Sequence, residues 1–246
     1  MLGPYKKAKD KVCIIGFAPS YIEAPWDDDS FEFWCLNEFY KVAPGIKNFH
    51  ADRWFEIHDL NSPSKNTPEH LEFLRSCPAL LYLQKKREDI PNGIPFPWQE
   101  LFDFFEARGY NGAKYFTNSV SEMIAFAIYL GFEEIGIYGV NMSSDSEYGW
   151  QKPSCEYWVG LAEGLGIKVT IPPSSELLKC AQVYGMESNN KLTAWMKEQR
   201  KEMNRRIQHF ARQEEEARKA MLQAQIAQAE CRGAAVAYLE MLKRRQ

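Results

Sequence analysis

Three ionisable side chains, Asp52, Glu56 and His58, are separated by even numbers of residues in the sequence HADRWFEIHDL. This stretch has the mixed polarity of a β-strand, in which residues at even spacing share one face. A histidine titrates near neutral pH, and at a strand end it is well placed to exchange a proton with a bound hydroxyl group. We therefore predict His58, with Asp52 or Glu56 beside it, as the acid–base group of a catalytic site.

A glycine turn follows the first predicted strand. The sequence VCIIGFAPSY, residues 12–21, runs from apolar residues into Gly16 and then into a segment that contains Ala18, Pro19 and Ser20. In α/β proteins, a strand that stops at glycine brings backbone N–H groups close to a phosphate. Ordinary strands also end in this way, so the turn alone leaves a phosphate site and a structural turn both open.

The clearest local unit is YFTNSVSEMIAFAIYLGFEEIGIYGVNM. Thr117, Asn118 and Ser119 are typical residues for capping a helix, which we expect over Val120–Leu130. Gly131 should stop this helix, and Glu134–Val140 should form a buried strand that ends at Asn141. The unit is the helix–strand repeat of a parallel sheet.

The remaining body repeats this alternation, with a Pro-rich loop expected before residue 99. Further strands are predicted at Phe31–Tyr40, His50–Leu60, Ala79–Gln84 and Ile167–Ile171, and further helices after Thr67, at Gln99–Ala107 and at Glu156–Leu165. Right-handed crossovers place the carboxyl ends of parallel strands at one edge. We predict an α/β fold with a Rossmann-like, mostly parallel sheet and helices on both faces.

Residues 186–246 differ in composition and form a predicted helical tail. Its residues follow a near-heptad spacing at Leu192, Met196, Gln199, Met203, Ile207 and Phe210. Such a stripe needs a partner, which is either another copy of the chain or the body. Gly233 interrupts the pattern, so one long helix and a helical hairpin are both open. We expect a nucleotide-binding domain in residues 1–185, a coiled-coil-like tail in residues 186–246, and a homo-oligomer formed through the tail.

The composition excludes several classes of protein. The net charge of −3 hides an acidic body and a basic tail, and an acidic body disfavours general nucleic-acid binding. The six cysteines include no Cys-x-x-Cys pair, which favours a reducing compartment. No apolar run approaches the roughly 18 residues of a membrane span, and the N-terminal sequence lacks the apolar core of a signal peptide. We expect a cytoplasmic protein without a membrane span.

Three stretches resemble the sialyltransferase-like glycosyltransferases of bacterial surface glycans. The same stretches are similar to the motility-associated-factor and hydroxymethylpterin-diphosphokinase-like families, and small bacteriophage-encoded relatives share this body. IIGFAPSY resembles the families' Gly-x-Gly-Pro-Ser-Leu turn, FWCLNEFY resembles Phe-Arg-Cys-Asn-Gln-Phe-Tyr, and FTNSVSEMIAFAIYLGFEEIGIYGVNM resembles their Thr-Ser-Gly start, alanine-rich helix and Gly-Ile-Asp strand end. The resemblance covers roughly residues 11–172, in consistent order.

The resemblance implies a site for a nucleotide sugar, commonly a CMP-linked acidic sugar, without an obligatory metal or cofactor. It implies direct displacement at the sugar carbon. The residues that match nucleotide-binding positions are Gly16, Ala18, Pro19, Ser20, Asn37, Thr117, Asn118, Ser119 and Asn141. Tyr148 and Gln151 follow the last matching strand and form either a lid over the donor or a surface loop. The acidic residues Asp27–Asp29 follow Pro25 and Trp26, so we interpret them as a solvated turn and expect no metal site.

Two departures from the families keep other functions open. Phe17 stands where the sialyltransferases carry an asparagine that contacts the donor, and no histidine occurs between His70 and His209, where their general base is expected. His58 is therefore the candidate base. The alternatives are a non-catalytic nucleotide-binding or sequestering protein and a structural assembly protein of phage origin, located in the host cytoplasm. Diphosphoryl transfer would need a divalent metal and clustered carboxylates.

Overall fold

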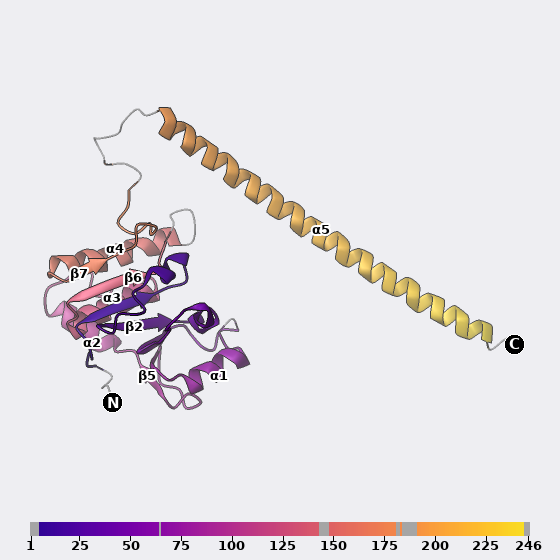
Figure 1. Ribbon diagram of the computed structural model, residues 1–246. Coiled ribbons are helices and arrows are strands. Elements are labelled where there is room, and N and C mark those ends of the chain that lie inside the picture. Colours follow the sequence, from indigo (N-terminus) through magenta and orange to yellow (C-terminus); the bar gives the residue numbers. More distant parts are fainter. Residues whose placement is uncertain (1–4, 64, 143–147, 181–182, 184–190, 244–246) are drawn as a thin grey trace. The chain divides into compact units, whose positions relative to one another are not determined.

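The protein is described by a computed structural model that covers residues 5–63, 65–142, 148–180, 183 and 191–243 (Figure 1). By its internal contacts the chain divides into two units, Met1–Lys179 and Cys180–Gln246. The first unit contains the sheet, and the second contains one long helix.

The first unit is built on one sheet of seven parallel strands in the order β5-β4-β3-β2-β1-β6-β7. The strands are β1 (Lys11–Ile15), β2 (Phe31–Leu36), β3 (Arg53–Glu56), β4 (Leu80–Leu83), β5 (Gly93–Pro95), β6 (Glu134–Tyr138) and β7 (Lys168–Thr170). From β1 to β5 the chain moves outward in one direction, and it then returns to place β6 on the other side of β1. The strand order therefore reverses between β1 and β6. At such a reversal the segments that follow the two adjacent strands lead away in opposite directions and leave a crevice at the carboxyl ends of the strands.

Helices cover both faces of this sheet (Figure 1). They are α1 (Pro68–Ser76), α2 (Trp98–Glu106), α3 (Ser119–Leu130) and α4 (Tyr148–Gly164), with the short 3-10 helices η1 (Pro19–Glu23), η2 (Phe39–Lys41) and η3 (Ala43–Gly45). On one face, Val12 and Ile14 of β1 pack into a core with residues of α2, α3 and α4. On the other face, Cys13 and Ile15 pack with residues of α1 and of the segment around η1 and η2. Alternate residues of β1 thus enter different cores, as the period of a strand requires.

Local signals in the sequence determine most of these boundaries. The hydroxyl oxygen of Thr67 accepts a hydrogen bond from the backbone N–H of His70, and Asn118 caps α3 in the same way. Gly131 ends α3 in the left-handed conformation, with φ at 75°. The α/β fold with a parallel sheet and helices on both faces is confirmed.

Two expectations about the body were wrong. The Pro-rich stretch before residue 99, predicted as a loop, contains the edge strand β5. Pro95 is tolerated there because it lies at the end of an edge strand, where a missing N–H breaks no essential hydrogen bond. Helix α4 begins at Tyr148 rather than at Glu156 and contains Pro153. A proline within the early turns removes one backbone hydrogen bond but need not end a helix whose other face is packed.

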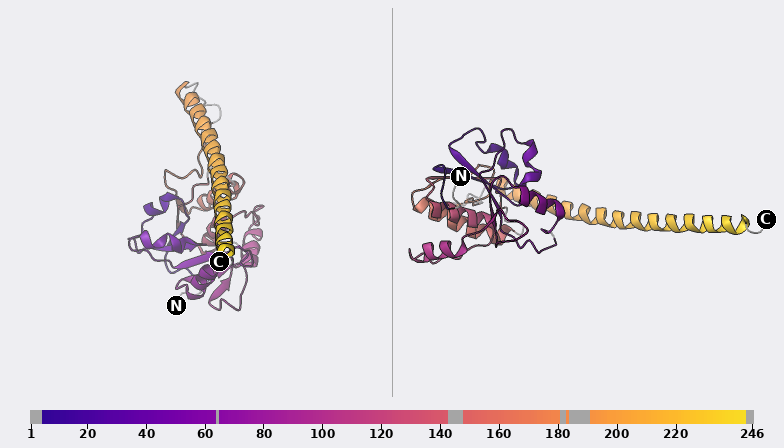
Figure 2. Two further views of the ribbon diagram at one scale, coloured as in Figure 1. Left: turned by 90° about the vertical axis from the view of Figure 1, so that its right-hand side faces the viewer. Right: turned by 90° about the horizontal axis from the view of Figure 1, so that it is seen from below.

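The second unit contains α5 (Lys191–Lys243), a single helix of 53 residues (Figure 2). The helix continues through Gly233, so the long-helix alternative is confirmed and the hairpin is not. At 100° per residue, Met203, Ile207, Phe210 and Met221 lie within about 40° of Met196 around the helix axis. These five side chains, which we call the tail stripe, are all exposed within the single chain. No described helix of the protein is both long and apolar enough to cross a membrane.

Candidate functional site

A cavity of about 830 Å³ opens at the carboxyl edge of the sheet, beside the reversal between β1 and β6. We call it the strand-end cavity. Its wall comes from the segments after β1, β2, β3 and β6 and from the first turn of α3. The predicted site residues that line it are Gly16, Ala18, Asn37, His58, Thr117, Asn118, Ser119, Asn141 and Gln151. Open parallel sheets bind ligands at this position, so the cavity is the candidate functional site.

Four predicted residues do not line the cavity. Pro19 is exposed at the start of η1, and Ser20 is buried in the wall, where its hydroxyl oxygen accepts a hydrogen bond of 3.0 Å from the N–H of Gly139. Asp52 precedes β3, at the opposite edge of the sheet, and accepts from the N–H of Phe33 at 2.8 Å. Glu56 is buried behind His58. The side chain of Tyr148 lies outside the described residues.

The glycine turn is bound to the end of β6. The N–H of Gly16 donates to the carbonyl of Tyr138 at 2.8 Å, and that of Ala18 donates to the carbonyl of Gly139 at 2.7 Å. A Cβ atom on Gly16 would lie 2.4 Å from the Gly139 oxygen, so the two backbones approach more closely than any side chain allows. Gly16 and Ala18 therefore shape the cavity floor, whereas the N–H of Phe17 has no acceptor among the described residues.

Asn37 is held in an unusual conformation at the end of β2. Its φ is 51°, in the left-handed region that asparagine tolerates better than most residues. Its N–H donates to the carbonyl of Phe55 at 2.9 Å, and its carbonyl accepts from the indole N–H of Trp54 at 2.9 Å. Its side-chain Oδ1 is enclosed and has no hydrogen-bond partner among the described residues. A fixed backbone and an unsatisfied polar atom beside a cavity are typical of a ligand contact.

A carboxylate shared by two histidines lies beside the cavity. Oε1 of Glu56 accepts from Nδ1 of His58 at 2.7 Å, and Oε2 accepts from Nε2 of His70 at 2.9 Å. Burial raises the pKa of Glu56, but the hydrogen bonds from His58 and His70 outweigh this effect and lower the pKa to about 2. Glu56 is therefore ionised and only accepts hydrogen bonds. In neutral His58 the proton lies on Nδ1, and Nε2 keeps its lone pair.

His58 is the exposed member of this group. Its side chain is 44% exposed and lines the strand-end cavity, whereas Glu56 and His70 are buried. His70 could not be singled out from the sequence, because nothing in the helix start TPEH distinguishes a histidine on the buried face of α1 from one on its surface. The arrangement can orient His58 as a base toward a ligand.

Thr117 and Asn118 connect α3 to α4. The Thr117 hydroxyl donates to the carbonyl of Gln151 at 3.1 Å and lies 2.6 Å from the Ser154 hydroxyl. Oδ1 of Asn118 caps α3 by accepting from the N–H of Ser121 at 3.0 Å. Their side chains are therefore engaged within the protein. The N–H groups of Ser119 and Val120, at the start of α3, have no acceptor among the described residues and carry the positive end of the helix dipole.

Asn141 anchors the segment that follows β7. Its side-chain Oδ1 and its carbonyl oxygen both lie 3.1 Å from the N–H of Glu176. Its side-chain amide group has no acceptor among the described residues and can donate toward the cavity that Asn141 lines.

Glu122, in the first turn of α3, is a cavity residue that the sequence analysis did not identify. Its Oε2 is enclosed and has no hydrogen-bond partner among the described residues. Burial alone raises the pKa of Glu122 to about 8. The carboxyl group is therefore neutral at pH 7. The sequence SVSEMIAF gives no sign of this burial, because a glutamate in the first turn of a helix is usually exposed and is favoured there by the helix dipole.

Glu122→Gln is expected to stabilise the protein by an amount that grows with pH. In the wild type, the unfolded chain loses the Glu122 proton near pH 4.5 while the folded state keeps it to about pH 8, so the stability contribution of Glu122 falls across this window. The difference from glutamine should grow by a few kcal/mol, at most about 5, and level off above about pH 8. Urea unfolding at several pH values measures it, and a constant difference would contradict the burial of a neutral acid.

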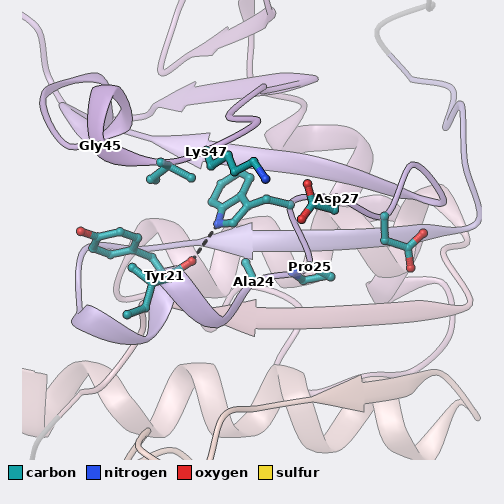
Figure 3. Close-up of a pocket in the computed structure, with 10 residues that line it drawn as sticks. Tyr21, Ala24, Pro25, Asp27, Gly45 and Lys47 are labelled. Carbon is teal, nitrogen blue, oxygen red and sulfur yellow. Dashed lines mark hydrogen bonds between the residues drawn. The ribbon is translucent and has the colours of Figure 1, made fainter.

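A second cavity, of about 500 Å³, lies between η1 and η3 (Figure 3). The Trp26 indole N–H donates to the carbonyl of Tyr21 at 3.0 Å. Asp27 accepts from the side-chain amide of Asn48, and Asp28 accepts from the N–H of Ser30 at 2.9 Å. No group of three or more His, Cys, Asp or Glu residues in the described part of the chain is arranged to hold a metal ion. The Trp26 indole and the Asp27 and Asp28 carboxylates are therefore already paired within the protein.

Fold and cavity together define a parallel α/β protein with a candidate ligand site at the carboxyl ends of its strands. No protein-family model and no curated protein sequence matches the chain. Among solved structures, the sialyltransferase CstII from Campylobacter jejuni in complex with CMP-3FNeuAc is 19% identical, with a TM-score of 0.45 over 65% of this chain and 79% of that chain. The same enzyme with cytidine-5'-monophosphate is 18% identical, with a TM-score of 0.47 over 73% and 90%. An α-2,3-sialyltransferase from Campylobacter jejuni in apo form is 15% identical, with a TM-score of 0.47 over 82% and 99%. These identities are too low to assign an activity.

Proposed function

We propose that this protein transfers a sugar from a nucleotide sugar to a hydroxyl group of an acceptor. The observation that carries the proposal is the position of His58, whose side chain is oriented by buried Glu56 and lines a cavity at the carboxyl ends of a parallel sheet. The same cavity offers unpaired backbone N–H groups at the start of α3, which suit a phosphate. The three sequence stretches described above support a CMP-linked acidic sugar as the donor.

The donor binds through dipoles rather than through cations. No lysine or arginine is among the described residues that line the strand-end cavity. The N–H groups of Phe17, Ser119 and Val120 are the available donors for phosphate oxygens. Rotation of the Asn37 side chain, which lines the cavity, turns its enclosed Oδ1 toward the donor, where it accepts from a ribose hydroxyl or a base amino group; this oxygen has no partner among the described residues.

The reaction is a direct displacement at the sugar carbon. His58 Nε2 takes the proton of the acceptor hydroxyl as the acceptor oxygen attacks. Glu56 holds the ring in the required tautomer, and His70 occupies the second oxygen of that carboxylate. This assignment gives Asp52, at the other edge of the sheet, no part in the transfer.

The test is native mass spectrometry of the full chain with a panel of CMP-, UDP- and GDP-sugars, followed by an assay for release of the free sugar. Slow hydrolysis of a bound nucleotide sugar supports the proposal, and a chelator should not change its rate. A nucleotide that is held but never turned over would instead indicate a binding or sequestering protein. The absence of any binding would overturn both of these functions and leave a structural assembly role.

We also propose that α5 joins two or more copies of the chain through the tail stripe. A long helix with an exposed apolar face is stabilised when that face packs against a like helix. Ile207→Glu should shift the protein toward the monomer in size-exclusion chromatography with light scattering. Gln208→Glu adds the same charge on the other side of the helix and should leave the oligomer intact. A wild-type monomer would show that the stripe packs elsewhere.

A further inference from the structure

Glu122 presents one side of its carboxyl group to the strand-end cavity. The side chain is partly exposed and lines the cavity, but its Oε2 is fully enclosed. Ionisation of Glu122 would place part of the negative charge on the enclosed Oε2, which has no hydrogen-bond partner among the described residues, and this would cost free energy. As the carbonyl oxygen of the neutral acid, Oε2 lacks only one hydrogen bond. The proton of the neutral acid therefore lies on Oε1, the oxygen on the cavity side.

Few charged groups face Glu122. His58 lines the same cavity, and the thiol of Cys155 on α4 lies nearby: burial raises the pKa of Cys155, and Glu156 and Glu122 raise it by smaller amounts. Glu122 and His58 are the only ionisable side chains among the described residues that line the cavity. Acid–base catalysis of a group transfer needs two ionisable groups in one active site, one that accepts a proton and one that donates a proton.

We propose that Glu122 is the general acid that protonates the departing phosphate oxygen of the donor. This inference rests on the proposed transfer reaction. The acceptor oxygen forms a bond to the sugar carbon while the bond from that carbon to the phosphate oxygen breaks. His58 Nε2 takes the acceptor proton, and Glu122 Oε1 gives its own proton to the leaving phosphate. His58 then releases a proton to water and Glu122 takes one up, which restores both groups.

The expected result concerns the rate and not the affinity. With CMP-N-acetylneuraminic acid as donor and water as acceptor, Glu122→Gln should lower kcat by roughly 10²–10⁴ near pH 6.5 and change the donor Kd by no more than a few-fold. In the wild type, kcat/KM should fall above about pH 8, where the free acid ionises. The variant should lack this alkaline limb, so that the two rates converge as the pH rises. Glu163→Gln makes the same substitution at an exposed position of α4, outside the cavity, and should behave as the wild type.

Each outcome separates the acid role from the reaction itself. If wild type and Glu122→Gln hydrolyse the donor at rates within about threefold of one another, the acid role is overturned and the transferase proposal stands. A rate ratio that does not change with pH would assign Glu122 a structural role. If the wild type hydrolyses neither this donor nor any other in the panel, both proposals fall. Thermal unfolding of each variant excludes loss of the fold as the cause.

Discussion

His58→Ala should lower the rate of nucleotide-sugar hydrolysis by roughly 10²–10⁴ while leaving the donor Kd within a few-fold of wild type. The reason is the position of the ring: it is 44% exposed on the cavity side and is bound by Glu56 on the other, so its removal deletes a base without disturbing the core. Single-turnover kinetics and calorimetric titration of the donor measure the two quantities separately.

Two further variants give this result its meaning. Asn37→Ala should have the opposite signature, a Kd raised about tenfold or more with a smaller change in kcat, because it removes a group that binds the donor. His209→Ala, on the exposed surface of α5, should change neither quantity. If His58→Ala weakens binding and unfolds the protein together, the histidine is structural and the base must be sought elsewhere.

Gly139→Ala should cost about 2–5 kcal/mol of unfolding free energy. Two effects add at this position. The φ of Gly139 is +70°, which strains any residue with a Cβ, and that Cβ would lie 2.2 Å from the carbonyl oxygen of Gly16. The overlap is with backbone, so relief requires the ends of β1 and β6 to separate. Because these ends form the cavity floor, donor binding should weaken as well.

Two other glycines resolve this prediction into its parts. Gly131 has a φ of +75° with nothing within 4 Å of an added Cβ, so Gly131→Ala isolates the backbone strain, about 1–2 kcal/mol. Gly16→Ala isolates the overlap, since its Cβ would meet the Gly139 oxygen at 2.4 Å. Denaturant unfolding of the three variants should place Gly139→Ala as the most destabilised. If Gly131→Ala and Gly139→Ala lower the free energy of unfolding equally, the close approach of Gly16 and Gly139 does not contribute to stability.

The sequence was most informative where the controlling interaction is local. The cap at Asn118 and the stop at Gly131 depend on groups within one helical turn, and both lie where the pattern predicts. The alternation of β1 between two cores follows from strand geometry alone. Boundaries failed where packing overrides local preference, as at Pro153 within α4 and at the short edge strand β5.

Within the candidate site, the sequence identified residue types but not their states. Gly16, Asn37 and His58 could be named from their places at the ends of predicted strands, and all three line the strand-end cavity. The sequence could not show which of Asp52 and Glu56 lies beside His58. Strand alternation assigns both carboxylates to one face of the sheet, but it does not show which of them lies at the end of the strand near the cavity. The structure places these two carboxylates at opposite edges of the sheet.

The sequence by itself determined the parallel α/β fold, both ends of α3 and the edge at which the strand-end residues gather, because periodicity, caps and crossover handedness are properties of short segments. The tertiary structure alone decided that His70 shares the Glu56 carboxylate, that Gly16 and Gly139 touch, and that Glu122 is neutral. Protonation depends on burial and on partners far away in the chain. Those are fixed only when the segments after different strands meet around one cavity.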